Sequence, residues 1–178
     1  MGLLDKLFGK VERRAVVDRP DPLGIQAAPH VVCAPASGQL MAMADIPDPV
    51  FACGAMGPAV GIKPDAGVVY APVSGTVTLT TGTLHALGMR SDNGVEILIH
   101  MGVDTVNMKG DGFTGFVEKG QRVSAGEALL VMDLEKVAAA GYSDVVITVV
   151  TNADDFAPVI PVEAGPVCAG AQVMTVTL

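Results

Sequence analysis

Short apolar segments alternate with turn-forming residues through most of the chain. Seven of them, rich in Val, Leu, Ile and Thr, have the length and the flanking Gly, Ser, Asn or Asp residues that are typical of β-strands. They cover residues 67–71, 75–81, 85–91, 95–100, 128–133, 143–151 and 173–178. Residues 134–140 could form a short helix that ends at Gly141. The pattern predicts an all-β protein with very little helix.

Two pairs of internal repeats indicate how these strands are organised. The segment Ala-Pro-x-Ser-Gly at residues 34–38 recurs at residues 71–75. Residues 117–126 have a similar counterpart, one residue shorter, at residues 162–170. A duplication of turn-and-strand units lets each half bury the apolar face of the other. The repeats therefore predict an antiparallel β-sandwich or flattened barrel with internal duplication.

The first 23 residues differ from the rest of the chain. Leu3, Leu4, Leu7, Phe8 and Val11 have helical spacing, which predicts a short amphipathic helix at residues 1–11. This segment could dock on its own protein, remain disordered in solution, or make weak, transient contact with an anionic membrane surface. Residues 12–23 end in Pro-Asp-Pro and have the composition of a linker. We expect an N-terminal segment at residues 1–23 and one β-sandwich domain at residues 24–178.

Composition and charge exclude several classes of function. The three cysteines, Cys33, Cys53 and Cys168, are odd in number and widely spaced, which argues against a disulfide framework or a cysteine zinc site. Five of the eleven basic residues precede Pro20, whereas sixteen of the nineteen acidic residues follow it. This acidic body should repel nucleic acid and suit a basic partner. Without a membrane-spanning run or a signal-peptide pattern, we expect a cytoplasmic monomer.

Two of the three histidines, His85 and His100, are symmetric about the turn-forming run Ser-Asp-Asn-Gly at residues 91–94. A hairpin with a two-residue loop at residues 92–93 would place them opposite each other, with Cβ atoms roughly 5 Å apart. A loop at residues 93–94 would make them diagonal neighbours, roughly 7–8 Å apart. A three-residue loop would send them to opposite faces. We interpret the pair as a site, because a titratable ring in an apolar strand costs free energy unless it has a partner.

Strand alternation then predicts the neighbours of the two rings. Thr83 and Leu87 should share a face with His85, and Leu98 should share one with His100. Thr83 could hydrogen-bond an imidazole nitrogen or an anion between the rings, or it could simply favour strand structure.

Two facing imidazoles suit metal ligation, acid–base catalysis or phosphoryl transfer. A zinc site needs a third protein ligand, and only Asp104, four residues after His100, is a candidate. The sequence has no nucleophile elbow and no carboxylate pair of the kind that hydrolases use. Phosphoryl transfer needs only an unprotonated ring nitrogen, in-line approach and donors around the phosphate.

Residues 94–106, Gly-Val-Glu-Ile-Leu-Ile-His-Met-Gly-Val-Asp-Thr-Val, resemble the signature segment of the glucose-type enzyme IIA family of the bacterial phosphoenolpyruvate-dependent sugar phosphotransferase system. Other segments resemble family positions in order over almost the whole chain. They are residues 1–7, 46–48, 51, 61–64, 83 with 85, 109–113 and 120–123.

The resemblance implies a specific role for each site residue. His100 would be phosphorylated through Nε2 by the histidine-containing phosphocarrier protein and would pass the phosphoryl group to a cysteine of a sugar-specific IIB domain. His85 would hold the phosphate during onward transfer, and Thr83 would orient a ring. Asp48 and Asp104 would be rim carboxylates that meet basic residues of the partners. An apolar docking surface would surround the histidines, with the expected members Val50, Phe51, Leu87, Leu98, Met101 and Val106.

The resemblance also carries expectations about ligands and other partners. The phosphoryl group would be carried covalently, with no cofactor required. Some relatives regulate sugar permeases, glycerol kinase or adenylate cyclase, and one such complex shares a zinc ion between the two histidines and a partner carboxylate. Thr81 and Leu98 stand where family members often have bulkier aromatic side chains, and Pro49 could stiffen the loop after Asp48. These departures predict a flatter docking face and different partners.

Two other classes of protein remain as alternatives. The Ala-Pro-x-Ser-Gly and Val-x-x-Gly-Gln-x-Val segments are also typical of lipoyl- or biotinyl-type carrier modules. Residues 133–136, Asp-Leu-Glu-Lys, lack the pattern around the prosthetic lysine that a ligase would recognise in such a module. A zinc peptidase of related duplicated β architecture would need a metal-ligand set that the sequence does not assemble.

Overall fold

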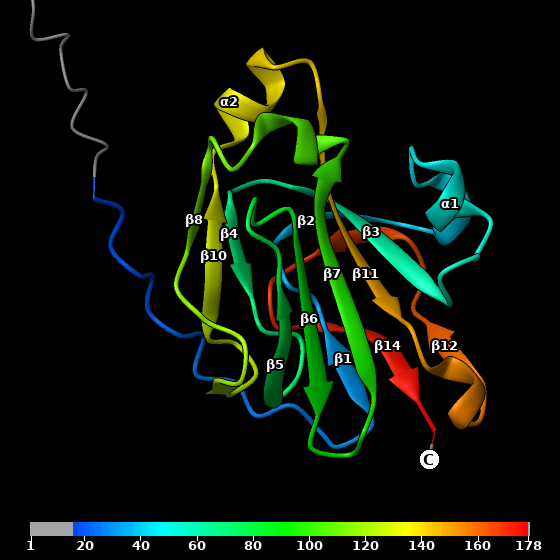
Figure 1. The fold of residues 1–178 in the computed structure, drawn as a ribbon. Coiled ribbons are helices and arrows are strands. Elements are labelled where there is room, and N and C mark those ends of the chain that lie inside the picture. The colour runs from blue at the N-terminus through cyan, green and yellow to red at the C-terminus, as the bar shows by residue number, and fades with distance from the viewer. Residues whose placement is uncertain (1–15, 178) are drawn as a thin grey trace, which may run out of the picture.

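The computed structural model describes residues 16–177. The amphipathic segment expected at residues 1–11 and the first residues of the expected linker lie outside this range. Within it, antiparallel sheets make up most of the regular structure, and the helices are short (Figure 1). This confirms the prediction of an all-β fold with very little helix.

The largest sheet has eight strands in the order β13-β2-β3-β11-β7-β6-β5-β9. Their bounds are β2 Gly38–Met41, β3 Ala59–Pro64, β5 Gly75–Thr80, β6 Ala86–Ser91, β7 Glu96–Val103, β9 Arg122–Val123, β11 Ser143–Val150 and β13 Gly165–Val167. Two three-stranded sheets have the orders β1-β14-β12 and β4-β10-β8. Their bounds are β1 Val31–Cys33, β4 Val68–Tyr70, β8 Phe113–Gly115, β10 Ala128–Met132, β12 Val159–Pro161 and β14 Gln172–Val176. The helices are α1 Pro49–Ala52 and α2 Leu134–Ala139, and single 3-10 turns occur at η1 Met43–Asp45, η2 Thr105–Met108 and η3 Ala153–Asp155.

The seven predicted strands and the predicted helix all form, with ends shifted by up to three residues. Strands without a clear alternating pattern escaped the sequence analysis, and β3 is an instructive case. It contains Gly61 and ends at Pro64, both of which disfavour an isolated strand. It is paired on one side with β2 and on the other with β11. Tertiary pairing therefore decides its conformation.

The internal repeat is visible as matching hydrogen bonds in the two halves. The hydroxyl oxygen of Ser37 accepts from the backbone N–H of Ala169 at 2.8 Å. The hydroxyl oxygen of Ser74 accepts from the backbone N–H of Ala125 at 2.9 Å. These residues occupy equivalent positions in the repeated segments. Each repeated serine thus joins the first repeat pair to the second.

The repeated glycines allow close backbone approach at equivalent places. A Cβ atom added to Gly38 would lie 2.0 Å from the carbonyl oxygen of Lys63, and one added to Gly75 would lie 2.0 Å from that of Arg90. No side chain fits at such a distance. The Ser-Gly pair is therefore a structural requirement of each half.

The large sheet separates two apolar clusters. Alternate residues of β7, namely Ile97, Ile99 and Met101, point into the main core, which includes side chains from all three sheets. The opposite face of the same sheet, beside α1, carries a smaller cluster of buried side chains (Figure 1). Its members are Ile46, Phe51, Ala59, Val145, Ile147 and Val149. The even-numbered β7 residues Leu98 and His100 belong to this second face.

One polar side chain in the main core has no partner, which leads to a stability prediction. The hydroxyl of Thr148 on β11 is fully buried and makes no hydrogen bond. Valine has the same shape without this unsatisfied group. We expect Thr148→Val to raise the free energy of unfolding by about 1–2 kcal/mol, measured by urea denaturation.

Thr105 provides the matched control for this prediction. It is also fully buried, but its hydroxyl donates to the carbonyl oxygen of Met101. Thr105→Val should therefore destabilise the protein, because the carbonyl loses its partner. A loss of stability in Thr148→Val as large as that in Thr105→Val would contradict the conclusion that the Thr148 hydroxyl lacks a hydrogen-bond partner.

The described part of the expected linker packs against the domain. It has no regular secondary structure, but the backbone N–H of Leu23 donates to the carbonyl oxygen of Gly126 at 2.9 Å. Arg19 donates to the carbonyl oxygen of Ala128 at 3.0 Å and contacts the carboxylate of Glu127. Of the helices in residues 16–177, none is long and apolar enough to cross a membrane.

Candidate functional site

The β6–β7 hairpin has a different loop from either of the two expected. The register pairs Arg90 with Glu96, and the backbone N–H of Ser91 donates to the carbonyl oxygen of Val95 at 2.8 Å. The loop therefore has three residues, and the prediction of a two-residue loop is wrong. The reason is Gly94, whose φ of 87° closes a three-residue turn in the left-handed region.

The two histidines nevertheless meet. Their ring centroids are 5.3 Å apart, with an angle of 76° between the ring planes. His100 lies within β7, but His85 lies just before β6 and follows Leu84, which has a φ of 56°. The backbone therefore turns before the strand begins, and strand alternation does not apply to His85. The expectation that a three-residue loop would separate the rings is wrong for this reason.

The backbone fixes which nitrogen of His100 carries a proton. Its Nδ1 lies 2.7 Å from the carbonyl oxygen of Gly102. A carbonyl oxygen only accepts, so Nδ1 donates, and Nε2 of the neutral ring is left with its lone pair. Gly102 has a φ of 77°, and an added Cβ would lie 2.4 Å from a side-chain carbon of Thr105. The glycine is thus needed to present this carbonyl.

Hydroxyl groups hold the other ring. Thr83 Oγ1 lies 2.5 Å from His85 Nδ1. A hydrogen bond from Thr83 to an imidazole nitrogen was one of the possibilities that the sequence indicated. Thr81 Oγ1 lies 3.3 Å from the same nitrogen, a contact that the sequence analysis missed. Within residues 16–177, no hydrogen bond is made to the Nε2 atom of either ring. Both rings are therefore tethered through Nδ1.

Burial lowers the pKa of both histidines, whereas the effect of nearby charges differs between them. Burial lowers the pKa of His100 from its ordinary value of 6.5, while the bond to Gly102 and the carboxylates of Asp48 and Asp104 partly offset this effect. The pKa of His85 is also lowered, first by burial and then by repulsion from His100. Both rings are therefore neutral near pH 7, as a nitrogen nucleophile requires.

The lowered pKa values predict how stability depends on pH. In the unfolded chain these histidines bind protons near pH 6.5, whereas in the folded protein they resist protonation until a lower pH. Just below pH 6.5 the unfolded state therefore binds more protons, so the free energy of unfolding should fall as the pH falls. Urea denaturation between pH 7 and pH 5 measures this fall, and a His85→Gln, His100→Gln double variant should flatten it. An equal slope in the double variant would contradict the assignment.

Two short loops place carboxylates near His100. Asp48 caps α1, where its Oδ1 accepts from the backbone N–H of Val50 at 2.8 Å. Asp104, with a φ of 60°, precedes η2. Both carboxylates act on His100 through space.

The residues expected to form an apolar docking surface fall into two groups. Val50 and Val106 are 50% and 45% exposed, and they follow Asp48 and Asp104 in the same two loops. Leu98 is half-buried on the face of the sheet that carries His100, and the Phe51 ring packs 5.2 Å from the His100 ring, centroid to centroid.

Leu87 and Met101 do not belong to this surface, and their expected place in it is wrong. Both are buried in the main core, on the face of the large sheet opposite His100. The three-residue loop pairs Leu87 with Ile99, whose side chain points into the main core. A two-residue loop at residues 92–93 would have paired it with Leu98, which lies on the face that carries His100. Met101 follows His100 in β7, so alternation turns it the other way.

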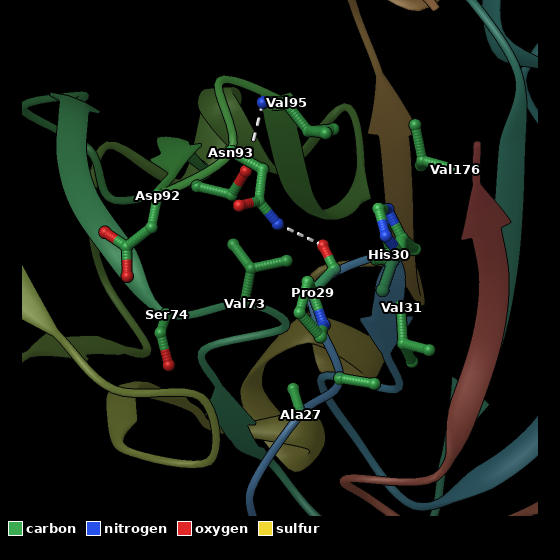
Figure 2. A pocket seen from close by; sticks show the side chains of 13 residues that line it. Ala27, Pro29, His30, Val31, Val73, Ser74, Asp92, Asn93, Val95 and Val176 are labelled. Carbon is green, nitrogen blue, oxygen red and sulfur yellow. Dashed lines mark hydrogen bonds between the residues drawn. The ribbon is translucent and has the colours of Figure 1, made fainter. Parts of the chain in front are cut away.

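A hollow of about 300 Å³ lies elsewhere, at the turn of the β6–β7 hairpin. Figure 2 shows His30 and Asn93 at its edge, with Asn93 donating a hydrogen bond to the carbonyl oxygen of Pro29. Neither His85 nor His100 lines it. In residues 16–177, no group of three or more His, Cys, Asp or Glu side chains could hold a metal ion.

Comparison with known proteins shows which family this chain resembles. A family model described as phosphoenolpyruvate-dependent sugar phosphotransferase system, EIIA 1, matches residues 30–156. The glucose-specific EIIA component of Halalkalibacterium halodurans is 41% identical over 155 residues, which cover 87% of this chain and 86% of that protein. The β-glucoside-specific EIIBCA component of Bacillus subtilis is 41% identical over 127 residues, 71% of this chain but only 21% of that longer protein.

A solved structure agrees with the sequence matches. Glucose permease IIA from Mycoplasma capricolum superposes with a TM-score of 0.71 and 34% sequence identity, over 81% of this chain and 93% of that one. The chain belongs to the EIIA 1 family of the phosphoenolpyruvate-dependent sugar phosphotransferase system.

Proposed function

We propose that His100 carries the phosphoryl group in this chain, receiving it from the histidine-containing phosphocarrier protein and passing it to a cysteine of a IIB domain. The observation that carries the proposal is the contact between His100 Nδ1 and the Gly102 carbonyl, which leaves Nε2 as the nucleophile. In the first step the phosphorus–nitrogen bond of the donor breaks as one to Nε2 forms. In the second step that bond breaks as a phosphorus–sulfur bond forms.

His85 and Thr83 have supporting roles in this proposal. The His85 ring lies beside His100, 5.3 Å away between centroids, and can donate a hydrogen bond to a phosphoryl oxygen. Thr83, through its contact with Nδ1, orients that ring. Donors that are fixed before the reaction stabilise developing charge without reorganisation.

Asp48 and Asp104 are proposed to form an acidic rim that guides basic partners. Their carboxylates stand close enough to His100 to offset part of the lowering of its pKa by burial. Phosphorylation adds up to about two negative charges, so partner cations must approach for transfer to proceed. Val50, Phe51, Leu98 and Val106 would supply the apolar part of the contact. Cytoplasmic location and participation in sugar uptake follow from the same role.

The test is reconstitution with phosphoenolpyruvate, enzyme I and the phosphocarrier protein, followed by mass spectrometry of the intact chain. We expect one phosphoryl group per chain, labile in acid, and none when enzyme I is omitted. A stable lysine adduct on the isolated protein would favour a lipoyl or biotinyl module, and tightly bound zinc would favour a zinc peptidase. Either result without phosphorylation would overturn the proposal.

A further inference from the structure

The loop before β6 brings a second hydroxyl to His85. Thr81 Oγ1 lies 3.3 Å from His85 Nδ1, on the nitrogen that Thr83 also contacts. Thr81 is tied to the start of β6 by three further hydrogen bonds. Its hydroxyl donates to the carbonyl oxygen of Ala86 at 3.1 Å and accepts from the N–H of Ala86 at 3.2 Å, and its own N–H donates to the same carbonyl at 3.2 Å.

These bonds determine what Thr81 can offer to the ring. A hydroxyl has one proton, and the Ala86 carbonyl can only accept, so the Thr81 proton points to that carbonyl. Towards His85 the Thr81 oxygen therefore presents a lone pair. The contact is favourable only when His85 Nδ1 carries a proton.

Thr83 has no such restriction. Within residues 16–177, the hydrogen-bond contact of the Thr83 hydroxyl is with His85 Nδ1 alone, so this hydroxyl is able to donate or accept there. An unprotonated Nδ1 has one lone pair, which accepts a hydrogen bond from the Thr83 hydroxyl alone. A protonated Nδ1 can instead donate to both threonine oxygens in a shared hydrogen bond. The pair of threonines thus distinguishes the two states of the nitrogen.

We propose that Thr81 is a positioning residue for His85, which holds the ring as an Nδ1–H donor and couples its orientation to the backbone at the start of β6. In the unphosphorylated protein the neutral ring carries its one proton on Nδ1. When His100 carries a phosphoryl group, the ring takes a second proton from solvent at Nε2, so that it donates from Nδ1 to Thr81 and from Nε2 to a phosphoryl oxygen. That is the form that compensates the charge of a phosphoryl group on His100. This consequence rests on the proposed function, but the hydrogen bonding itself does not.

The backbone around the loop is consistent with a fixed ring. Leu84 is held at a φ of 56°, which costs free energy for a residue other than glycine, and its side chain packs against the main core. The N–H of Leu84 donates to the carbonyl oxygen of Thr81 at 2.9 Å. Thr81 is therefore hydrogen-bonded both to Leu84, within the loop, and to Ala86, at the start of β6.

The experiment compares Thr81→Val with Thr81→Ser, and Thr80→Val, at the neighbouring last residue of β5, is the matched control. Nitrogen-15 NMR of the His85 side chain in the unphosphorylated protein reports the proton at Nδ1. Rapid-quench assays separate uptake by His100 from onward transfer. We expect Thr81→Val to reduce the Nδ1–H population and slow onward transfer about three- to tenfold, the effect of one net hydrogen bond, while uptake changes less.

Thr81→Ser should restore both values, and Thr80→Val should change neither. If Thr81→Val lowers only the stability and leaves the His85 signals and onward transfer unchanged, the role is merely structural and the proposal fails. If Thr81→Val does not fold, wild-type His85 decides the matter, because a neutral ring without a proton on Nδ1 would overturn the proposal. Expected NMR changes in a protein that takes up no phosphoryl group would instead reject the proposed function.

Discussion

Replacement of His100 by glutamine is expected to abolish phosphoryl uptake, with a loss of at least about 10³-fold in the rate of labelling from the phosphocarrier protein. Glutamine can still donate to the Gly102 carbonyl, but it has no nucleophilic nitrogen in place of Nε2. The covalent intermediate cannot form without that atom. Labelling from isotopic phosphoenolpyruvate, followed by mass spectrometry, measures the result.

His30→Gln is the matched control for this variant. His30 is exposed and lines the hollow at the far turn of the hairpin, away from the paired rings. The same chemical change there should leave uptake unaltered. Circular dichroism and the urea midpoint show whether each variant is folded. Undiminished labelling of a folded His100→Gln protein would show that another residue accepts the phosphoryl group.

The class of fold was predictable because it depends on patterns that repeat many times. Alternating apolar segments and the duplicated Ala-Pro-x-Ser-Gly units act at many positions, so an error of one or two residues at a strand end does not change the architecture. The two matching serine bonds, at Ser37 and Ser74, show that the sequence repeat is a structural one. Strands such as β3, which contains Gly61 and ends at Pro64, depend on their neighbours and leave no clear local signal.

The site was harder to predict because it depends on single backbone conformations. The pairing of His85 with His100 was expected from a two-residue loop, but it arises from the left-handed turn at Leu84. Leucine is not a residue that indicates a positive φ, so the sequence gives little sign of this turn. The same register error placed Leu87 on the wrong face. The contact of Thr81 likewise follows from the closed loop and not from strand spacing.

The carbonyl of Gly102 also escaped the sequence analysis, although a signal for it exists. A glycine two residues after the proposed nucleophile can bring its backbone close to the ring, since it tolerates a positive φ. Asp48 and Asp104, by contrast, act on His100 through charge, which needs no close contact. Groups that act at a distance are less sensitive to register than groups that must hydrogen-bond.

Replacement of His85 by glutamine is expected to separate the two transfers. His100 keeps its tether to Gly102 and its free Nε2, so it should still accept a phosphoryl group. Onward transfer to the IIB cysteine should slow by about 10²–10³-fold, the cost of removing one preorganised donor from a developing charge. A glutamine amide also lacks the second nitrogen that Thr83 and Thr81 hold, so its donor is not fixed in position.

The split between the two steps is what makes this prediction specific. Phosphorylated His85→Gln protein should accumulate when phosphoenolpyruvate, enzyme I and the phosphocarrier are present, and it should discharge slowly on addition of the IIB domain. His30→Gln should discharge at the wild-type rate. Because the rings are 5.3 Å apart between centroids, a donor on His85 can reach a group on His100. Equal losses in uptake and discharge would mean that His85 acts on the His100 ring itself and not on the phosphoryl group that His100 carries.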